Sequence, residues 1–340
     1  MPATAVRRCR VAWAAVAVLA IARVDAAAAN GEPIVLLVGG IEKQIYLPVR
    51  LAEQLGYFRE QGLEVELQSE PSGVNAEDQL LAGAVQGVVG FYDHTIDLQA
   101  KGKAVESVVQ LAQAPGEAVL VSTRLAGQIR SPADFKGRRL GVAGLGSSTE
   151  FLTLYLAATN GVKATEIVAV PVGGGTTFIA ALKQSRIDAG MTTDPTISRL
   201  LKDAEATMIV DLRSPEQTQR VLGGLYPAAC LYMESAWVKS HREQVQRLVT
   251  AFLKTLVYIQ THSADEIAAR MPADYFAGDR ELYVRALAGN KAMFTPDGRM
   301  PESGPATVLK VLSSVDRALR GKQIDLSRTY TTEFITSAAR

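Results

Sequence analysis

The stretch GVAGLGSSTEF, residues 141–151, joins a glycine-rich turn to the start of a predicted helix. The first N–H groups of a helix lack partners within the helix and lie at the positive end of its dipole, so such a turn can bind an anion. Ser147, Ser148 and Thr149 add hydroxyl groups at the same point. In the alternative interpretation one serine only caps the helix. No lysine follows the last glycine as in a P-loop, which argues against a nucleotide site.

Two further stretches present polar groups in a similar way. GGGTT, residues 173–177, repeats the glycine-to-helix pattern and offers Thr176. MTTDP, residues 191–195, offers Thr193 and Asp194. Because Asp194 precedes a proline at a predicted helix start, we interpret it mainly as an N-cap.

Aromatic residues and one histidine complete the candidate set. FYDH, residues 91–94, ends an apolar strand, so one of its two rings could stack on a flat ligand. Its aspartate is interpreted as a helix cap, and its histidine as a ligand contact, although a lone histidine is more often structural. The acidic candidates would repel an anion. The full set of candidate ligand-binding residues is Glu42, Tyr46, Phe91, Tyr92, His94, Ser147, Ser148, Thr149, Thr176, Thr193, Asp194 and Tyr226.

No metal, cofactor or catalytic constellation is nominated by the sequence. His241 and His262 occur in polar helical contexts far from His94, which argues against a metal site. No G-x-S-x-G motif is present, and no Ser–His–Asp triad can be nominated from spacing. We therefore expect no cofactor and no catalytic residues.

The first 29 residues have the order of a secretory signal peptide. Arg7, Arg8 and Arg10 precede an apolar run of 12 residues, and small residues follow up to Ala29. The run is shorter than the roughly 20 residues of a membrane span, which disfavours the alternative of a retained anchor. We expect cleavage near Ala29 and a periplasmic mature protein; the general secretory and twin-arginine routes both remain open.

The charge balance and the cysteine count of the mature chain exclude some classes of partner and site. Removing residues 1–29 takes away four arginines and one aspartate, which leaves 32 basic and 34 acidic residues and a net charge of −2. This balance argues against nucleic acid as a partner. Cys230 is the one cysteine left, so an intrachain disulfide and a cysteine-ligated metal are excluded.

Apolar strands and amphipathic helices alternate through most of the mature chain. Residues 33–40 are predicted as a buried strand and 47–62 as a helix, and the same order returns at 138–144 and 148–161. Such alternation predicts an α/β fold with mainly parallel sheets flanked by helices, and its repetition predicts two similar lobes. From residue 235 the pattern is mostly helical, and we expect this tail to pack on the first lobe.

Several of these stretches resemble a known family. They are LAEQLGYFREQGLEVEL, LLAGAVQGVVGFYDHTI, SPADFKGRRLGVAGLGSS, ALKQSRIDAGMTTDP and NAEDQ. The sequence resembles the periplasmic substrate-binding proteins of ABC importers for sulfonates, nitrate and taurine, in the same superfamily as the NMT1/THI5-like proteins. The resemblance covers about residues 33–260. Thr193 stands where many relatives have tryptophan, and Gln86-Gly87 where they often have aspartate, so no relative's substrate can be copied over.

The resemblance implies a two-lobed periplasmic binding protein fold of type II, with a ligand cleft between the lobes and no chemistry. Lobe 1 is expected at residues 30–122 and 224–340, and lobe 2 at 123–223. The two chain crossings are expected near 120–125 and 213–226. In open parallel sheets ligands bind beyond the carboxyl ends of the strands, which is where the candidate residues occur.

The leading hypothesis is a binding protein that captures a small organic anion, a sulfonate or an aromatic or other carboxylate. It would act as a monomer and deliver the ligand to an ABC permease and ATPase in the inner membrane. Two alternatives stay open. One is an enzyme of the thiamine-pyrimidine synthase-like branch. Its members look cytosolic and carry Cys and His clusters, whereas this sequence has a predicted signal peptide, Cys230 alone and scattered histidines. The other is a ligand-binding partner of a periplasmic sensor, which neighbouring sensor genes would favour.

Overall fold

The computed structural model describes Met1 and residues 33–338. The predicted signal peptide lies, apart from Met1, outside the described residues, so its cleavage and the export route stay predictions. Gly31–Arg340 form one unit, which carries all the elements below.

The first lobe is built on a five-stranded sheet with the strand order β2-β1-β3-β10-β4. β1 pairs in parallel with β2 and β3, whereas β10 runs antiparallel to both β3 and β4. The apolar residues of these strands are largely buried because helices cover the sheet. In sheet order the strands are β2 (Val65–Ser69), β1 (Ile34–Val38), β3 (Gly87–Phe91), β10 (Ala229–Glu234) and β4 (Val105–Gln110).

The second lobe repeats this plan with the order β7-β6-β8-β5-β9. β6 pairs in parallel with β7 and β8, and β5 runs antiparallel to β8 and β9. The prediction of two α/β lobes with a strand-and-helix repeat is confirmed, and each sheet is mixed because one strand runs against the other four. The strands are β7 (Val168–Pro171), β6 (Arg139–Val142), β8 (Ala189–Thr193), β5 (Glu117–Ser122) and β9 (Ala206–Leu212).

The antiparallel strand of each sheet is the one reached by crossing from the other lobe. β5 forms its hydrogen bonds with β8 and β9, so residues 117–122 belong to the second sheet, not to lobe 1 as the boundary at residue 122 assumed. The chain therefore crosses first between Gln110 and Glu117, earlier than the expected 120–125. It returns between Leu212 and Ala229. An apolar strand pattern reports burial but not which sheet the strand joins, which is why the boundary was misplaced.

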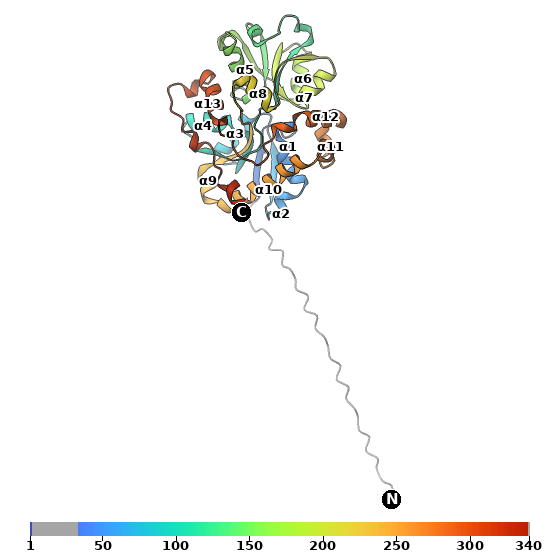
Figure 1. The fold of residues 1–340 in the computed structure, drawn as a ribbon, viewed down its shortest axis with the longest axis vertical. Coiled ribbons are helices and arrows are strands. Elements are labelled where there is room, and N and C mark those ends of the chain that lie inside the picture. The colour runs from blue at the N-terminus through green and yellow to red at the C-terminus, as the bar shows by residue number, and fades with distance from the viewer. Residues whose placement is uncertain (2–32, 339–340) are drawn as a thin grey trace. The chain divides into compact units, whose positions relative to one another are not determined.

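Helices of the first lobe and of the C-terminal tail surround the first sheet, and α5 to α8 surround the second (Figure 1). The first group is α1 (Leu47–Gln54), α2 (Tyr57–Glu60), α3 (Gly73–Leu81), α4 (Asp93–Ala100), α9 (Ser235–Ser240), α10 (Arg242–Thr261), α11 (Ala264–Ala268), α12 (Arg280–Asn290), α13 (Gly304–Val315) and α14 (Glu333–Ala338). The second group is α5 (Ser148–Thr159), α6 (Gly175–Lys183), α7 (Thr196–Lys202) and α8 (Pro215–Leu222). The short 3-10 helices are η1 (Gln44–Tyr46), η2 (Thr123–Leu125), η3 (Pro132–Phe135), η4 (Ala164–Glu166), η5 (Ala273–Phe276), η6 (Lys291–Met293), η7 (Arg317–Leu319) and η8 (Leu326–Arg328).

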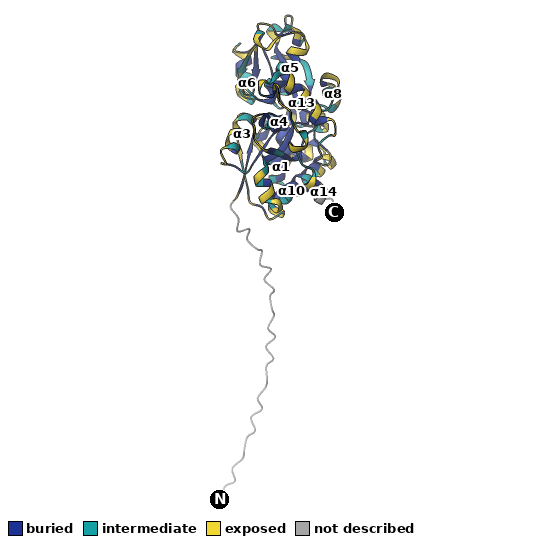
Figure 2. Cartoon of the chain, turned by 90° about the vertical axis from the view of Figure 1, so that its left-hand side faces the viewer, coloured by how far each residue is buried: buried dark blue, intermediate teal, exposed yellow. Residues whose placement is uncertain are grey.

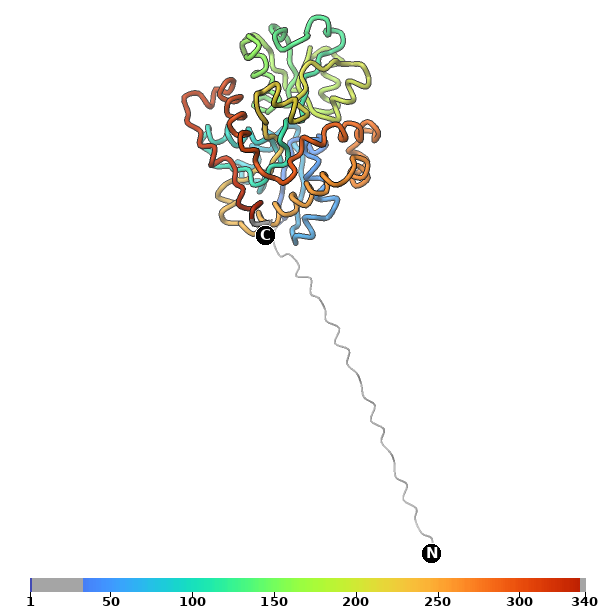
Figure 3. Tube along the Cα trace, viewed as in Figure 1, coloured from blue at the N-terminus to red at the C-terminus, as the bar shows by residue number. Residues whose placement is uncertain are grey.

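The C-terminal tail touches both lobes. α13 packs against α4 of the first lobe and against α5 of the second, and α12 packs against α7. In the trace, the orange segment with α11 and α12 and the red segment with α13 flank the junction of the lobes (Figure 3). The tail packs on the first lobe, as expected, and its helices α12 and α13 also contact second-lobe helices.

Large apolar side chains pack between each sheet and its helices, and the strands are coloured mostly as buried in Figure 2. Leu36 and Leu231 are fully buried in the first lobe, and Leu120 and Phe178 in the second. Within residues 33–338, no helix combines the length and the apolar character that a membrane crossing requires. In the same range, no cluster of three His, Cys, Asp or Glu side chains could hold a metal ion.

Candidate functional site

A small cavity lies where strand ends of the two sheets face each other. Its volume is about 30 Å³, room for little more than a water molecule. Its first-lobe lining is Gly39, Lys43, Ile45, Tyr46, Gly73, Phe91 and His94. Its second-lobe lining is Glu117, Ala143, Ser147, Ser148, Thr149, Gly173, Gly174, Met191, Thr192 and Thr193. The cavity therefore forms at the carboxyl ends of parallel strands, as expected for an open α/β sheet.

Lys43 is delivered to the cavity by the turn after β1. Gly40 has a φ of +105°, and a Cβ there would lie 2.5 Å from Lys43 Cε, so only glycine fits this turn. Lys43 Nζ donates to the carbonyls of Gly39 at 2.5 Å and Pro71 at 3.2 Å. The side chain is only 8% exposed. Burial lowers the pKa of Lys43, and Glu42 and Glu117 oppose that shift.

Glu117 faces the cavity because β5 runs antiparallel to β8. The first residue of β5 lies opposite Thr193, the last residue of β8, and so occupies the same edge of the sheet. Glu117 is 2% exposed, and its Oε2 atom has no hydrogen-bond partner in the described part of the chain. Burial raises the pKa of this carboxyl well above its usual value; Asp93 adds to the shift and Lys43 opposes it.

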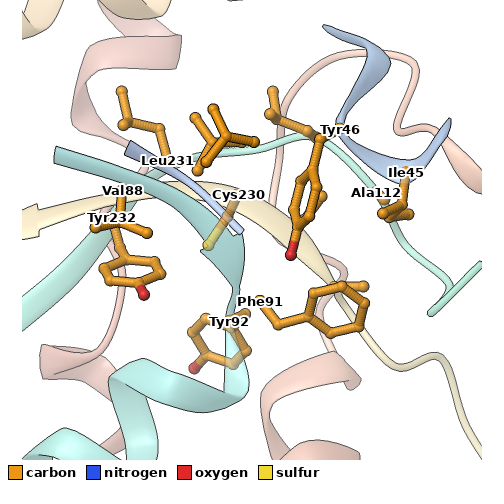
Figure 4. Close-up of a cluster of buried hydrophobic side chains, with 14 of the residues drawn as sticks. Ile45, Tyr46, Val88, Phe91, Tyr92, Ala112, Cys230, Leu231 and Tyr232 are labelled. Atoms are coloured by element: carbon orange, nitrogen blue, oxygen red, sulfur yellow. The ribbon is translucent and has the colours of Figure 1, made fainter. Parts of the chain in front are cut away.

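Two aromatic rings form one wall of the cavity. Tyr46 and Phe91 meet edge to face with ring centroids 6.2 Å apart (Figure 4). Tyr92, the next residue, points away from both rings and bonds Thr329 Oγ1 at 2.5 Å through its hydroxyl. Tyr226 is fully buried and also lies outside the cavity lining. Tyr92 and Tyr226 therefore do not line the cavity, and a ligand contact at either stays a prediction; Tyr92 follows the last residue of β3, where successive side chains alternate in direction.

The hydroxyl groups of the glycine-rich turn before α5 are used within the protein. The Ser147 hydroxyl donates to the Gly144 carbonyl at 2.6 Å, and Thr149 Oγ1 lies 2.7 Å from Ser147 Oγ. The Ser148 hydroxyl donates across the lobes to Asp93 Oδ1 at 3.0 Å. The hydroxyl protons are thus engaged by the protein itself. The backbone N–H groups of Ser148 and Thr149 have no acceptor among the described residues, so the free donors here are main-chain groups.

Asp93 joins the two lobes instead of capping its own helix. It receives the Ser148 hydroxyl from the second lobe and the Tyr226 hydroxyl, at 2.7 Å, from the returning crossing. α4 has no side-chain cap, so the expected capping role of Asp93 was wrong. Burial raises the pKa of Asp93 to about 6, and the two hydroxyl hydrogen bonds oppose the shift.

This pKa gives a test of the Asp93 environment. A carboxyl with a raised pKa in the folded state contributes stability that is full below its unfolded pKa of about 3.9 and is lost as the pH rises through about 6. Asp93→Asn cannot titrate, so from pH 4 to pH 7.5 its free energy of unfolding should improve relative to the parent by as much as about 3 kcal/mol. Urea unfolding at several pH values measures this difference.

Asp78→Asn, an exposed position on α3, is the matched control and should show no such slope. A constant offset between Asp93→Asn and the parent would reflect altered hydrogen bonding alone. A difference that does not change between pH 4 and pH 7.5 would contradict the assignment of a raised pKa to Asp93.

His94 lies at the edge of the cavity with one nitrogen unused. Its Nδ1 is 3.2 Å from the Tyr232 hydroxyl and 3.5 Å from Glu77 Oε2. Its Nε2 is buried and has no hydrogen-bond partner among the described residues. Burial lowers the pKa of His94, which favours the neutral ring. A neutral imidazole offers either a donor or an acceptor at Nε2, according to its tautomer.

A larger groove of about 490 Å³ adjoins the cavity and shares Lys43 and Gly174 with it. Glu42 and Thr176 are exposed and line this groove, not the cavity. The groove continues past Tyr275, Phe276 and Tyr283 of the C-terminal tail.

Asp194 lines neither space. Its Oδ1 accepts from the N–H of Ser198 at 2.9 Å, in the first turn of α7. Its Oδ2 accepts from Asn290 at 2.6 Å and from Arg213 at 3.3 Å. Both oxygens of Asp194 are therefore used within the protein, so its role as a ligand contact stays an untested prediction.

Comparison with known proteins supports the two-lobed architecture. The model of the family described as NMT1/THI5 like matches residues 44–265. A solved structure from Bordetella bronchiseptica RB50 is 34% identical with a TM-score of 0.86, over 91% of this chain and 97% of that one. The alkanesulfonate-binding protein SsuA from Xanthomonas axonopodis pv. citri, bound to MOPS, is 19% identical with a TM-score of 0.70, over 89% and 99%.

The periplasmic nitrate-binding protein NrtA from Synechocystis PCC 6803 is 12% identical with a TM-score of 0.72, over 90% of this chain and 88% of that one. At these identities SsuA and NrtA show the shared fold alone. None of the curated proteins matches the chain.

Proposed function

Because the chain belongs to the NMT1/THI5-like family, we propose that it is the solute-binding component of an ABC importer. The observation that supports this role is the cavity between the lobes, lined by buried polar groups that the described part of the chain leaves unpaired. Buried polar groups in a folded protein are nearly always paired, so unpaired ones facing a cavity indicate a missing partner.

The proposed ligand is a small organic acid, either a sulfonate or a carboxylate. The main-chain donors at the start of α5 and the Lys43 ammonium suit an acidic head group. The Tyr46–Phe91 wall suits an apolar body, and the adjoining groove has room for one. The protein is proposed to act as a monomer in the periplasm and to pass its ligand to a permease and ATPase.

Cross-lobe contacts imply that the ligand enters through an opening motion. Besides the Ser148–Asp93 bond, Lys202 of α7 lies 2.5 Å from Asp279, which precedes α12. A cavity of about 30 Å³ admits no organic acid while these contacts hold. The lobes should therefore exchange between an open and a closed state. Ligand binding should shift this equilibrium by as much as the difference between its affinities for the two states.

The test is calorimetry and thermal unfolding of residues 30–340 with organic sulfonates, aromatic carboxylates, small amino acids and nitrate. An acid present at 100 times its dissociation constant should stabilise the protein by about 2.7 kcal/mol. Mass spectrometry of the recovered acid then separates binding from catalysis. Recovery of unchanged acid supports a transport role, whereas conversion to a product would support the enzyme alternative. Absence of binding by every acid would contradict the proposal.

A further inference from the structure

Glu117 is the buried group that a simple acid would leave unsatisfied. Its carboxylate is aimed into the cavity, is 2% exposed, and has an oxygen with no partner among the described residues. Lys43 is a nearby cation whose charge favours the ionised form of Glu117, but it makes no hydrogen bond to Oε2. A buried carboxyl oxygen without a partner is unfavourable, and a donor from the ligand would satisfy it and favour its ionised form.

The charges around the cavity show what that donor must be. Lys43 is the lysine among the described residues that line it, and its charge interacts with Glu42 and Glu117; Asp93 in turn interacts with Glu117. Asp93 already receives two hydroxyl donors, whereas Glu117 receives none. A ligand that carries only negative charge would therefore leave Glu117 without a hydrogen-bond donor and would repel its carboxylate.

The unpaired donors and the unpaired acceptor lie on different elements of the second lobe. Unpaired N–H groups lie at the start of α5, at Ser148 and Thr149, and the unpaired acceptor lies at the start of β5. A ligand that satisfies both carries two different polar groups. We propose that the ligand has, beside its acidic group, a nitrogen donor such as an ammonium or an N–H group, which binds the Glu117 carboxylate. This inference rests on the proposed function and narrows its ligand class.

The test uses matched acids that differ only in the amino group. The probes are β-alanine with propionate, 4-aminobutanoate with butanoate, and 3-aminobenzoate with benzoate, each titrated calorimetrically into residues 30–340. The amino member of at least one pair should bind about ten- to a hundredfold more tightly, as expected for a hydrogen bond between charged groups. In Glu117→Gln this preference should fall, because the amide oxygen can accept a hydrogen bond from an ammonium but forms no ion pair with it.

A second measurement does not depend on the choice of probe. Without any ligand, Glu117→Gln should raise Tm at pH 7.5, because it removes an unpaired buried carboxyl and keeps its size. Glu64→Gln, at an exposed position just before β2, is the matched control and should leave both Tm and the preference unchanged. A lower Tm for Glu117→Gln would show that the carboxyl is satisfied within the protein and would overturn the inference.

The remaining outcomes separate the two proposals. If the acids without an amino group bind as tightly as their partners, and Glu117→Gln binds them like the parent, the inference fails and the proposed function stands. If no acid of either kind binds, and none of the wider panel does, both fail.

Discussion

Lys43→Met is expected to weaken the binding of every acid that the parent protein binds by about a hundredfold or more. Truncating one member of a buried, hydrogen-bonded charge pair costs about 2–5 kcal/mol, and each 1.4 kcal/mol is a factor of ten in affinity. Methionine keeps the length of the side chain, so the cavity wall stays filled while the ammonium is lost. The effect should be large because Lys43 is the cation that lines the cavity and is almost fully buried.

Calorimetry with the tightest acid of the panel measures the effect, and Lys239→Met, on the exposed surface of α9, is the control that should bind like the parent. Lys43→Met also leaves the carbonyls of Gly39 and Pro71 without the Nζ donor, so Tm should fall by the equivalent of about 1–3 kcal/mol. Unchanged affinity together with a lower Tm would assign Lys43 to the structure of the turn and contradict a role in binding.

Candidates at the carboxyl ends of three parallel strands line the cavity, whereas Tyr92 and Asp194, which directly follow β3 and β8, do not. Phe91 ends β3, Thr193 ends β8, and Ser147 precedes α5 just after β6, and all three line the cavity. Their positions follow from two local facts, an apolar run and the glycines or polar residues that stop it. The alternation of strands and helices likewise predicted two similar lobes.

Glu117 and Lys43 were missed for a physical reason. The predicted site residues come at or after the ends of strands, whereas Glu117 is the first residue of β5. Only the antiparallel pairing of β5 with β8 brings that end of the strand to the cavity. That pairing is a long-range property of the sheet, although a charged residue opening an otherwise apolar strand was a visible signal. Lys43 was missed because its burial depends on the left-handed turn at Gly40, and lysine is almost never fully buried in proteins.

The use of each hydroxyl also could not be predicted from sequence. Ser148 looked like an anion contact, but in the structure its proton is donated to Asp93, 55 residues away in the chain. Which partner a hydroxyl takes is decided by side chains that the fold brings together, so residue type alone indicates a polar environment and not a role.

Gly190→Ala is expected to cost about 3 kcal/mol of folding free energy, the upper end of the range for overpacking. Gly190 of β8 lies opposite Gly141 of β6, and a Cβ at Gly190 would stand 2.6 Å from the Gly141 carbonyl oxygen. It would also lie 2.9 Å from the Gly141 nitrogen and Cα. These are backbone atoms, so no rotamer change relieves the clash and the two strands must separate.

Because β6 and β8 carry the glycine-rich turn and Thr193 to the cavity, the same separation should weaken acid binding as well as stability. Gly289→Ala is the matched control: nothing lies within 4 Å of a Cβ there, in the exposed part of α12. Alanine favours a helix over glycine by up to about 1 kcal/mol, so this variant should be as stable as the parent or more so. Urea unfolding at one pH measures the free energy of unfolding of both variants. Equal values for the two would contradict a contact between β6 and β8 at Gly190 that is too close for any side chain.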